Sequence, residues 1–156
     1  MARTIEYASQ LQWIGNTGTG TSNYTGYSRD YHLHVQGKPE LAGSAGHLFR
    51  GDPARHDPED HFLAAIAGCH LLSYLALAAR NGVVVVDYRD DTSGVLELES
   101  GGGRFTSVTL RPTVTIAAGS DRDLAMTLHD TAHEQCFIAN SCRVPIHHEP
   151  TILVAE

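Results

Sequence analysis

The chain has 156 residues, 42% of them hydrophobic, so it is long enough and apolar enough to bury a core. A formal net charge of −7 and scattered basic residues exclude the concentrated positive surface that binding to nucleic acid or an anionic membrane requires. Three cysteines and an N-terminus without an apolar leader predict a cytoplasmic protein with reduced thiols. We expect a single domain over residues 1–156.

Strands are predicted before residue 50. Residues 31–35 alternate between apolar side chains and histidines, which predicts a half-buried strand. A Gly-Lys-Pro turn at residues 37–39 leads to a second predicted strand at residues 46–49. Residues 16–26 are rich in glycine, serine, threonine and asparagine, and they predict a loop.

A long helix is predicted from Pro58 to the Asn-Gly pair at residues 81–82. Asp57 is a suitable N-cap, proline suits the first helical position, and Asn-Gly is a typical helix end. Residues 62–79 are apolar over about the length of a minimal membrane span. A histidine and a serine interrupt this stretch, so we interpret it as a core helix buried on all sides and not as a membrane span.

The second half of the chain contains further predicted strands. Residues 83–88 and 95–98 predict two strands joined by a turn. Residues 107–116 alternate in polarity, which predicts a one-sided antiparallel strand with Pro112 at an edge or a bulge. Residues 151–155 predict a closing strand. Strands interleaved with two helices make the fold class α+β.

A second helix is predicted to start at Ser120–Asp123, where the sequence resembles a capping box. Apolar residues then recur every four positions up to Cys136, so we expect this cysteine on the buried stripe of the helix. Cys69 likewise lies in the first predicted helix, among apolar neighbours. Taken alone, each thiol would be an inert core side chain whose pKa is raised by burial.

The residues before Cys69 carry a family resemblance. The segment Asp57-Pro58-Glu59 is followed by Cys69 after nine intervening residues. It resembles the Asn-Pro-Glu signature that leads to the peroxidatic cysteine of the OsmC/Ohr family, the osmotically inducible protein C and organic hydroperoxide resistance proteins. The resemblance implies an α+β OsmC-like fold, in which antiparallel sheets enclose long central helices and two chains intertwine as a homodimer. It also implies that Cys69 is the nucleophile.

A resolving cysteine is implied on the following helix, and Cys136 has that place. Cys142 competes for the role, although it lies after the predicted helix. Phe137 follows Cys136 where the hydroperoxide-resistance branch usually has proline, and His70 follows Cys69. These two departures resemble a less characterised OsmC-like branch.

Two arginines are candidates for lowering the pKa of Cys69, as the chemistry of the family requires. Arg29 lies in Tyr-Ser-Arg-Asp-Tyr, which resembles the Gly-Arg-Asp-Gly loop of the hydroperoxide-resistance branch. Arg50 lies in Phe-Arg-Gly-Asp, one residue from the position that the osmotically inducible branch uses. We choose Arg29 over Arg50 as the arginine that lowers the pKa of Cys69. The alternative is that each arginine is only a solvated residue on a strand.

Glu59 matches the glutamate of the family signature. Ten residues of helix span about 15 Å, so Glu59 cannot contact Cys69 along one straight helix. Three alternatives follow: the helix breaks between them, a second subunit completes the site, or Glu59 only stabilises the helix start.

The resemblance implies a cysteine peroxidase that needs no metal or organic cofactor. The Cys69 thiolate would attack an organic hydroperoxide and become a sulfenic acid, which condenses with Cys136 to a disulfide. An external dithiol, such as a lipoyl group, would then reduce the disulfide.

Two alternatives use the same fold differently. His129, His133 and Cys136 stand at positions i, i+4 and i+7 on one helical face, a spacing that can ligate a metal such as zinc. The other alternative is a non-redox binding protein that kept the fold and lost the chemistry.

Overall fold

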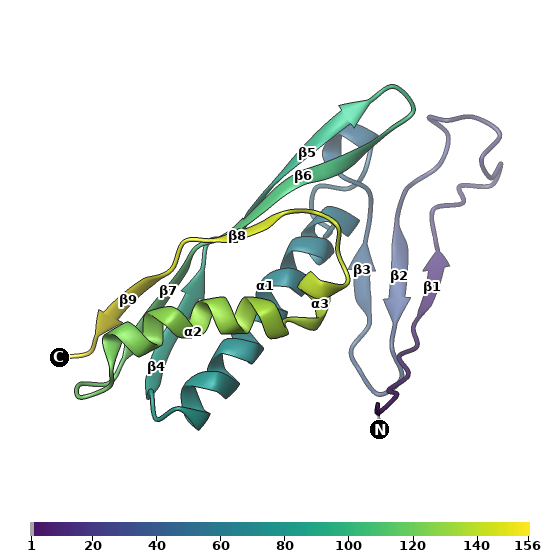
Figure 1. The fold of residues 1–156 in the computed structure, drawn as a ribbon. Helices are drawn as coiled ribbons and strands as arrows, with labels where there is room; N and C mark the ends of the chain where they lie inside the picture. Colours follow the sequence, from purple (N-terminus) through teal and green to yellow (C-terminus); the bar gives the residue numbers. More distant parts are fainter. Residues whose placement is uncertain (1) are drawn as a thin grey trace. The chain divides into compact units, whose positions relative to one another are not determined.

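The computed structural model describes residues 2–156 and divides into two compact units, the first ending at His61 and the second running from Phe62 to Glu156. In the first unit, β1 (Gln10–Trp13), β2 (Tyr31–His34) and β3 (Leu41–Gly43) form an antiparallel sheet in the order β1-β2-β3 (Figure 1). The predicted strand at residues 31–35 is confirmed as β2.

The predicted strand at residues 46–49 is wrong. A single 3-10 turn, His47–Phe49, occupies these residues, and the strand that pairs with β2 is β3, a few residues earlier. Arg50 ends the turn in the left-handed region, with φ of 65°. Short apolar runs do not distinguish a strand from a helical turn, so only the pairing with β2 decides between them.

Helix α1 (Pro58–Arg80) begins at the end of the first unit and contributes most of its length to the second. The Asp57 carboxylate accepts a hydrogen bond from the Asp60 N–H at 2.8 Å, and the Asp60 carboxylate accepts one from the Asp57 N–H at 3.2 Å. This reciprocal capping satisfies two backbone donors at the helix start, and it confirms Asp57 as the predicted N-cap. Gly82, with φ of 73°, follows the helix end, which confirms the predicted exit.

Six strands of the second unit form two three-stranded sheets. One sheet has the order β4-β7-β9 and the other the order β5-β6-β8 (Figure 1). The expected antiparallel pairing holds for β4 with β7 and for β5 with β6, whereas the final strands β8 and β9 pair in parallel with β6 and β7. The strands are β4 (Val85–Asp90), β5 (Ser93–Glu99), β6 (Gly102–Leu110), β7 (Pro112–Ile116), β8 (Ile146–His148) and β9 (Thr151–Val154).

The chain passes from β6 to β7 through one residue, Arg111, at the junction of the two sheets. Its backbone N–H donates to Asp90 at 2.8 Å, and its guanidinium donates to Glu149 at 3.0 Å and to Ser93 at 2.8 Å. Pro112 is therefore the first residue of a central strand, where its missing N–H is tolerated, and not part of an edge strand.

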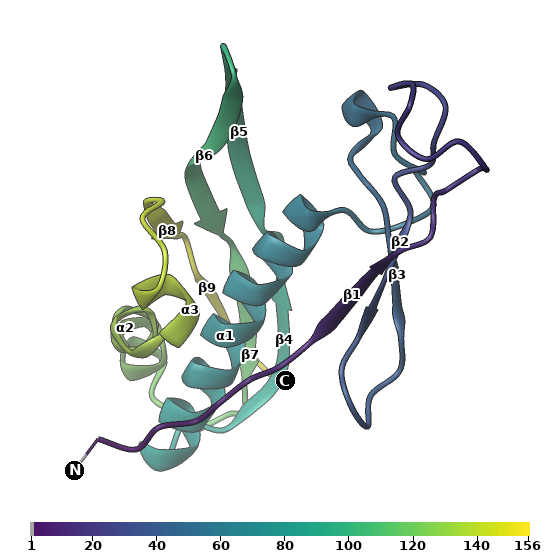
Figure 2. The same ribbon diagram turned by 90° about the vertical axis from the view of Figure 1, so that its right-hand side faces the viewer.

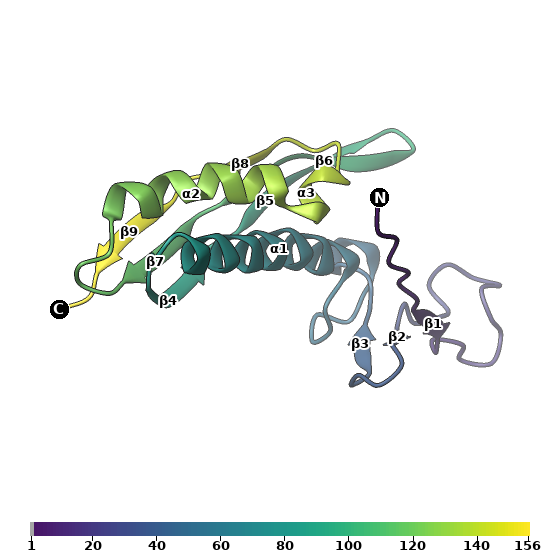
Figure 3. The same ribbon diagram turned by 60° about the horizontal axis from the view of Figure 1, so that its bottom comes forward.

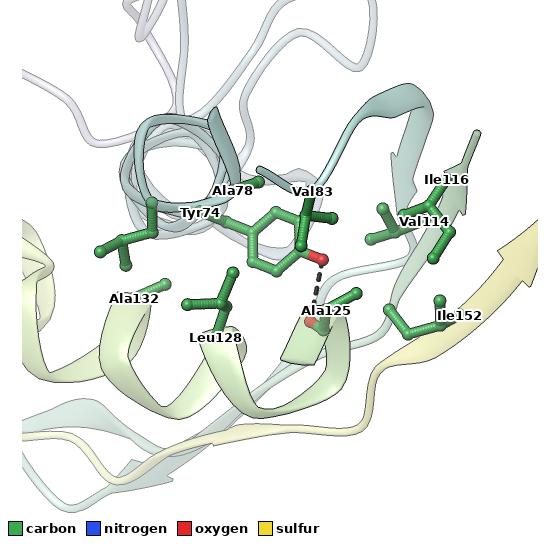
Figure 4. Close-up of a cluster of buried hydrophobic side chains, with 10 residues drawn as sticks. Tyr74, Ala78, Val83, Val114, Ile116, Ala125, Leu128, Ala132 and Ile152 are labelled. Atoms are coloured by element: carbon green, nitrogen blue, oxygen red, sulfur yellow. Dashed lines mark hydrogen bonds between the residues drawn. The ribbon is translucent and has the colours of Figure 1, made fainter. Parts of the chain in front are cut away.

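Helix α2 (Arg122–Gln135) lies beside α1, and the short helix α3 (Phe137–Asn140) follows it (Figures 2 and 3). The predicted helix start is confirmed, but the capping box is not: Asp121, not Ser120, is the N-cap, and its side chain accepts from the Leu124 N–H at 2.9 Å. Figure 4 shows the main core between the two helices and the β4-β7-β9 sheet, with the Tyr74 hydroxyl donating to the Ala125 carbonyl at 2.9 Å. The labelled core residues are Tyr74, Ala78, Val83, Val114, Ile116, Ala125, Leu128, Ala132 and Ile152.

Helix α1 is long and apolar enough to cross a membrane by length and composition alone. The core helix of a soluble protein passes the same test, so this is weak evidence for a span. One face of α1 packs into the core through residues such as Tyr74 and Leu77. The expectation of burial on all sides is wrong for this chain taken by itself, because Leu72 on the other face is 68% exposed.

Candidate active site

The second unit brings Cys69 and Cys136 together. Cys69 lies midway along α1 and is partly exposed, whereas Cys136 is buried at the end of α2. Both are free thiols, and the Cys136 thiol donates a hydrogen bond to the Cys69 sulfur. Two residues 67 positions apart in the sequence therefore form one dithiol site.

Cys136 does not lie within a helix, contrary to the prediction. Helix α2 ends at Gln135, and Cys136 has an extended backbone with φ of −71° and ψ of 112° before α3 starts. Its Sγ accepts a hydrogen bond from the Ala139 N–H at 3.4 Å and so acts as the N-cap of α3. The break turns the first N–H groups of α3 toward the dithiol site, where they can act as donors.

Burial raises the pKa of Cys69, but hydrogen bonds outweigh it and the net pKa is lowered. The donors are the Ile138 N–H, the Cys136 thiol, the Phe137 N–H and the Ser73 hydroxyl. The sequence predicted that an arginine lowers this pKa, whereas hydrogen-bond donors to the charged form have the same effect within the second unit. Ser73, one turn after Cys69, could have been identified from its i+4 spacing.

The pKa of Cys136 moves in the opposite direction, to about 11. Burial is the main cause, and the nearby Cys69 sulfur adds to it because a second negative charge beside the first is unfavourable. The pair thus has one sulfur that ionises readily and one that keeps its proton. This asymmetry suits a nucleophile beside a proton-bearing partner thiol.

A pair of buried histidines includes His70, the residue after Cys69, and its contact with His129 was not predicted from the sequence. His70 Nε2 is 3.0 Å from His129 Nδ1, and the two rings stack 5.3 Å apart. The Tyr74 ring stacks on the His129 ring with centroids 3.9 Å apart, and the centroid of the His148 ring is 5.9 Å from that of His70. Burial lowers the pKa of His70 to about 4 and that of His129 to about 3, and neighbouring histidines add to the effect.

The predicted residues Arg29, Arg50 and Glu59 all belong to the first unit. Arg29 donates to the carbonyls of Tyr27 and Tyr24 at 2.6 and 2.5 Å, and its guanidinium lies over both tyrosine rings. This arginine is held by its own loop and is not a freely solvated side chain. Arg50 is exposed at the end of the 3-10 turn.

Glu59 lies near Tyr31 in the first unit. The pKa of Tyr31 is raised by burial, and the carboxylates of Asp57 and Glu59 raise it further. Helix α1 is continuous from Pro58 to Arg80, so a helix break does not bring Glu59 to Cys69. Of the three alternatives for Glu59, a partner subunit and a role at the helix start remain.

Arg55 is a first-unit residue that the sequence argument did not consider. Its Nε lies 3.6 Å from the Asp30 carboxylate and 3.5 Å from that of Asp52. Its Nη1 is buried and has no hydrogen-bond partner among the described residues.

The metal alternative is not supported by the geometry. Among residues 2–156, no three histidine, cysteine, aspartate or glutamate side chains are arranged to hold a metal ion. His129 is engaged with His70, and Cys136 lies beyond the end of the helix that the i, i+4, i+7 argument assumed.

A family model described as OsmC-like protein matches residues 51–150, about two thirds of the chain. The chain belongs to the OsmC-like family. The predicted family and α+β fold class are therefore confirmed. This OsmC-like protein is 32% identical to an OsmC-like protein of unknown function from Vibrio cholerae, over 94% of this chain and 99% of that one, with a TM-score of 0.84.

Other solved structures share the OsmC-like fold at lower identity. An organic hydroperoxide resistance protein OsmC from Legionella pneumophila is 19% identical over 97% of this chain and 100% of that one, with a TM-score of 0.67. The organic hydroperoxide resistance protein OhrB of Bacillus subtilis is 18% identical over 94% of this chain and 98% of that one, with a TM-score of 0.60. No curated protein matches the chain.

Proposed function

We propose that this OsmC-like protein is a thiol peroxidase that reduces organic hydroperoxides to alcohols. The observation that supports this most is the contact between Cys69 and Cys136 with opposite pKa shifts. The Phe137 and Ile138 N–H groups, the Cys136 thiol and the Ser73 hydroxyl together lower the Cys69 pKa, which a non-redox core would not need. Structural neighbours named for organic hydroperoxide resistance support the same class of activity.

The proposed reaction has three steps. The Cys69 thiolate attacks the O–O bond of ROOH, which oxidises the sulfur to a sulfenic acid and releases ROH after uptake of one proton. The Cys136 thiol then condenses with the sulfenic acid, forming the disulfide and releasing water. A dithiol, such as a lipoyl group, reduces the disulfide and is itself oxidised to a disulfide. A cytoplasmic location, where thiols are kept reduced, fits this cycle.

A peroxidase assay tests the proposal. Purified protein is mixed with cumene hydroperoxide and dihydrolipoate, in parallel with hydrogen peroxide and dihydrolipoate, and peroxide loss is followed. We expect faster loss of cumene hydroperoxide, because apolar side chains such as Leu63 and Leu71 lie on the same helix as Cys69. No loss of either peroxide would favour the alternative of a non-redox binding protein.

Arg29 is the cation that we propose assists this chemistry. Its guanidinium is immobilised by two carbonyls and two aromatic rings, and immobilised donors stabilise developing charge better than mobile ones. Hydrogen-bond donors in its own unit already lower the pKa of Cys69. We therefore propose that Arg29 stabilises the charge that develops on the leaving oxygen of the hydroperoxide, and not the charge of the thiolate.

Arg29→Ala should therefore slow the reaction of Cys69 with cumene hydroperoxide at neutral pH by about tenfold, equivalent to ~1.4 kcal/mol. Raising the pH should restore little of the rate, because the thiolate population is not what the variant loses. Stopped-flow measurement of thiol oxidation at two pH values checks this. Arg50→Ala is the matched comparison, and a slow Arg50→Ala with a normal Arg29→Ala would reverse the assignment. Full recovery at high pH would instead show that Arg29 sets the pKa.

A homodimer is also proposed for this chain. Large apolar side chains near the dithiol site are exposed, with Leu72 at 68% and Phe137 at 80% exposure. The hairpin of β5 and β6 also exposes Val95 and Leu98. Apolar surface of this extent is typical of a protein interface.

Leu72→Glu is expected to convert the dimer to a monomer, because it places a charge in the proposed apolar interface. Light scattering at micromolar concentration should give twice the mass of one chain for the unmodified protein and the mass of one chain for the variant. Glu134→Gln, an exposed change on α2, serves as the control and should stay dimeric. A monomeric unmodified protein would contradict the dimer.

A further inference from the structure

A cavity of about 710 Å³ lies in the second unit and contains none of the residues proposed for the peroxidase site. Its walls come from the start of α1, from β6 and from the segment that follows α3. This volume is within the usual range for small-molecule sites. The lining residues are Phe62, Arg104, Phe105, Thr106, Ser141, Cys142, Arg143, Val144 and Pro145.

One wall of the cavity is apolar. The rings of Phe62 and Phe105 stack with centroids 5.0 Å apart, and Val144 packs with them against the smaller core cluster of Ile66, Val108 and Leu110. Because these side chains are held by a buried cluster, the wall is preformed. The side chains of this wall can contact the hydrocarbon part of a ligand, but they cannot form hydrogen bonds with polar groups of the ligand.

Two arginines, Arg104 and Arg143, also line the cavity. Neither forms an ion pair or a side-chain hydrogen bond with any residue from 2 to 156, and what distinguishes them from other unpaired arginines such as Arg50 and Arg80 is that both line one cavity. Glu97 is opposite Arg104 in the hairpin register but is not within ion-pair distance and does not line the cavity. Two unpaired guanidiniums at one cavity of an acidic chain favour an anionic ligand group.

We propose that this cavity binds an apolar carboxylate, with Arg104 and Arg143 contacting the carboxylate and the Phe62–Phe105 wall contacting the hydrocarbon. Guanidinium pairs planar carboxylates through two parallel hydrogen bonds, and the aromatic wall removes the hydrocarbon from water. The proposal does not depend on the peroxidase function, because it concerns equilibrium binding at a separate cavity.

Calorimetric titration with decanoate tests the ligand class on the full chain. We expect decanoate to bind, decan-1-ol to bind at least fivefold more weakly, and acetate not to bind measurably. Arg104→Gln and Arg143→Gln should each weaken decanoate binding at least fivefold. The matched control is Arg89→Gln, whose side chain is exposed and pairs with Asp87 on β4, and it should leave the affinity unchanged.

Cys142 provides a second measurement that needs no variant. Its thiol is partly exposed in the cavity wall, so bound decanoate should slow its alkylation by iodoacetamide at least threefold, as read by peptide mass mapping. Equal affinity for decanoate and decan-1-ol would overturn the role of the arginines. Unchanged Cys142 alkylation at saturating decanoate would overturn the cavity as the binding site. None of these readouts requires peroxide turnover, so they separate this inference from the proposed activity.

Discussion

Cys69→Ser is expected to reduce peroxide consumption to the level of the protein-free reaction. The thiolate is the attacking group, and a serine hydroxyl at the same position neither ionises near neutral pH nor forms a sulfenic acid. Steady-state loss of cumene hydroperoxide with dihydrolipoate as reductant measures the effect. The four donors that lower the Cys69 pKa remain in the variant, so a loss of rate reports the sulfur itself.

Two other cysteine variants make this result specific. Cys142→Ser should keep most of the rate, because Cys142 lies after α3 and is not among the groups that hydrogen-bond to Cys69. Cys136→Ser should still consume about one equivalent of peroxide and should accumulate the Cys69 sulfenic acid, which a dimedone adduct identifies by mass. Equal losses in Cys69→Ser and Cys142→Ser would show that the nucleophile is wrongly assigned.

Acid should unfold this protein more steeply than its carboxylates alone require. Burial is the main reason that the folded-state pKa values of His70 and His129 fall to about 4 and about 3, below the ordinary value of 6.5. Between pH 6.5 and those values the unfolded chain binds protons that the folded chain excludes, so the free energy of unfolding falls as the pH falls. Each histidine contributes a slope of about 1.4 kcal/mol per pH unit in this window and nothing above it.

Urea unfolding at several values between pH 7.5 and pH 4.5 measures this slope. The double variant His70→Leu with His129→Leu removes both partners of the hydrogen bond together, which avoids leaving one buried ring unpaired. The free energy of unfolding of this double variant should depend less steeply on pH than that of the unmodified protein. The difference should correspond to at most two protons taken up on unfolding. His147→Gln, an exposed histidine on β8, should keep the original slope. Parallel pH profiles for the double variant and the unmodified protein would contradict the prediction.

The charges around the histidine pair act in both directions. His148 and His133 disfavour protonation of His70, and Asp130 favours protonation of His129. His148 is itself 2.8 Å from Asp130, so that carboxylate is shared. The contribution of His70 and His129 to the pH dependence of unfolding is therefore obtained by comparing the variants with the unmodified protein, and not from the slope of one protein alone.

Local signals predicted the helix starts well. Asp57 and Asp121 cap their helices through side-chain oxygens, which is a property of a few adjacent residues and can be read from them. The strand at residues 31–35 was predictable for the same reason, because its alternation is local. The family resemblance placed the two candidate cysteines in separate elements, and the structure places both in one unit.

Features that depend on distant partners were not predictable. Apolar periodicity continues from Leu124 through Cys136, so nothing in the pattern marks the break after Gln135. That break supplies the N–H donors that lower the Cys69 pKa, and the sequence argument assigned this role to an arginine instead. His70 and His129 are 59 residues apart, so their contact was also beyond local reasoning.

The cap on α3 has a consequence for the reduction potential of the proposed disulfide. Reduced Cys136 caps α3 through its sulfur, and the Phe137 and Ile138 N–H groups at the same helix start lower the pKa of reduced Cys69. Bonding the sulfurs to each other weakens these interactions, so they stabilise the dithiol over the disulfide. An N-cap of ~1 kcal/mol alone corresponds to roughly 20 mV for a two-electron couple. The disulfide should accordingly be a stronger oxidant than an unconstrained one, which makes its reduction by an ordinary cellular dithiol favourable.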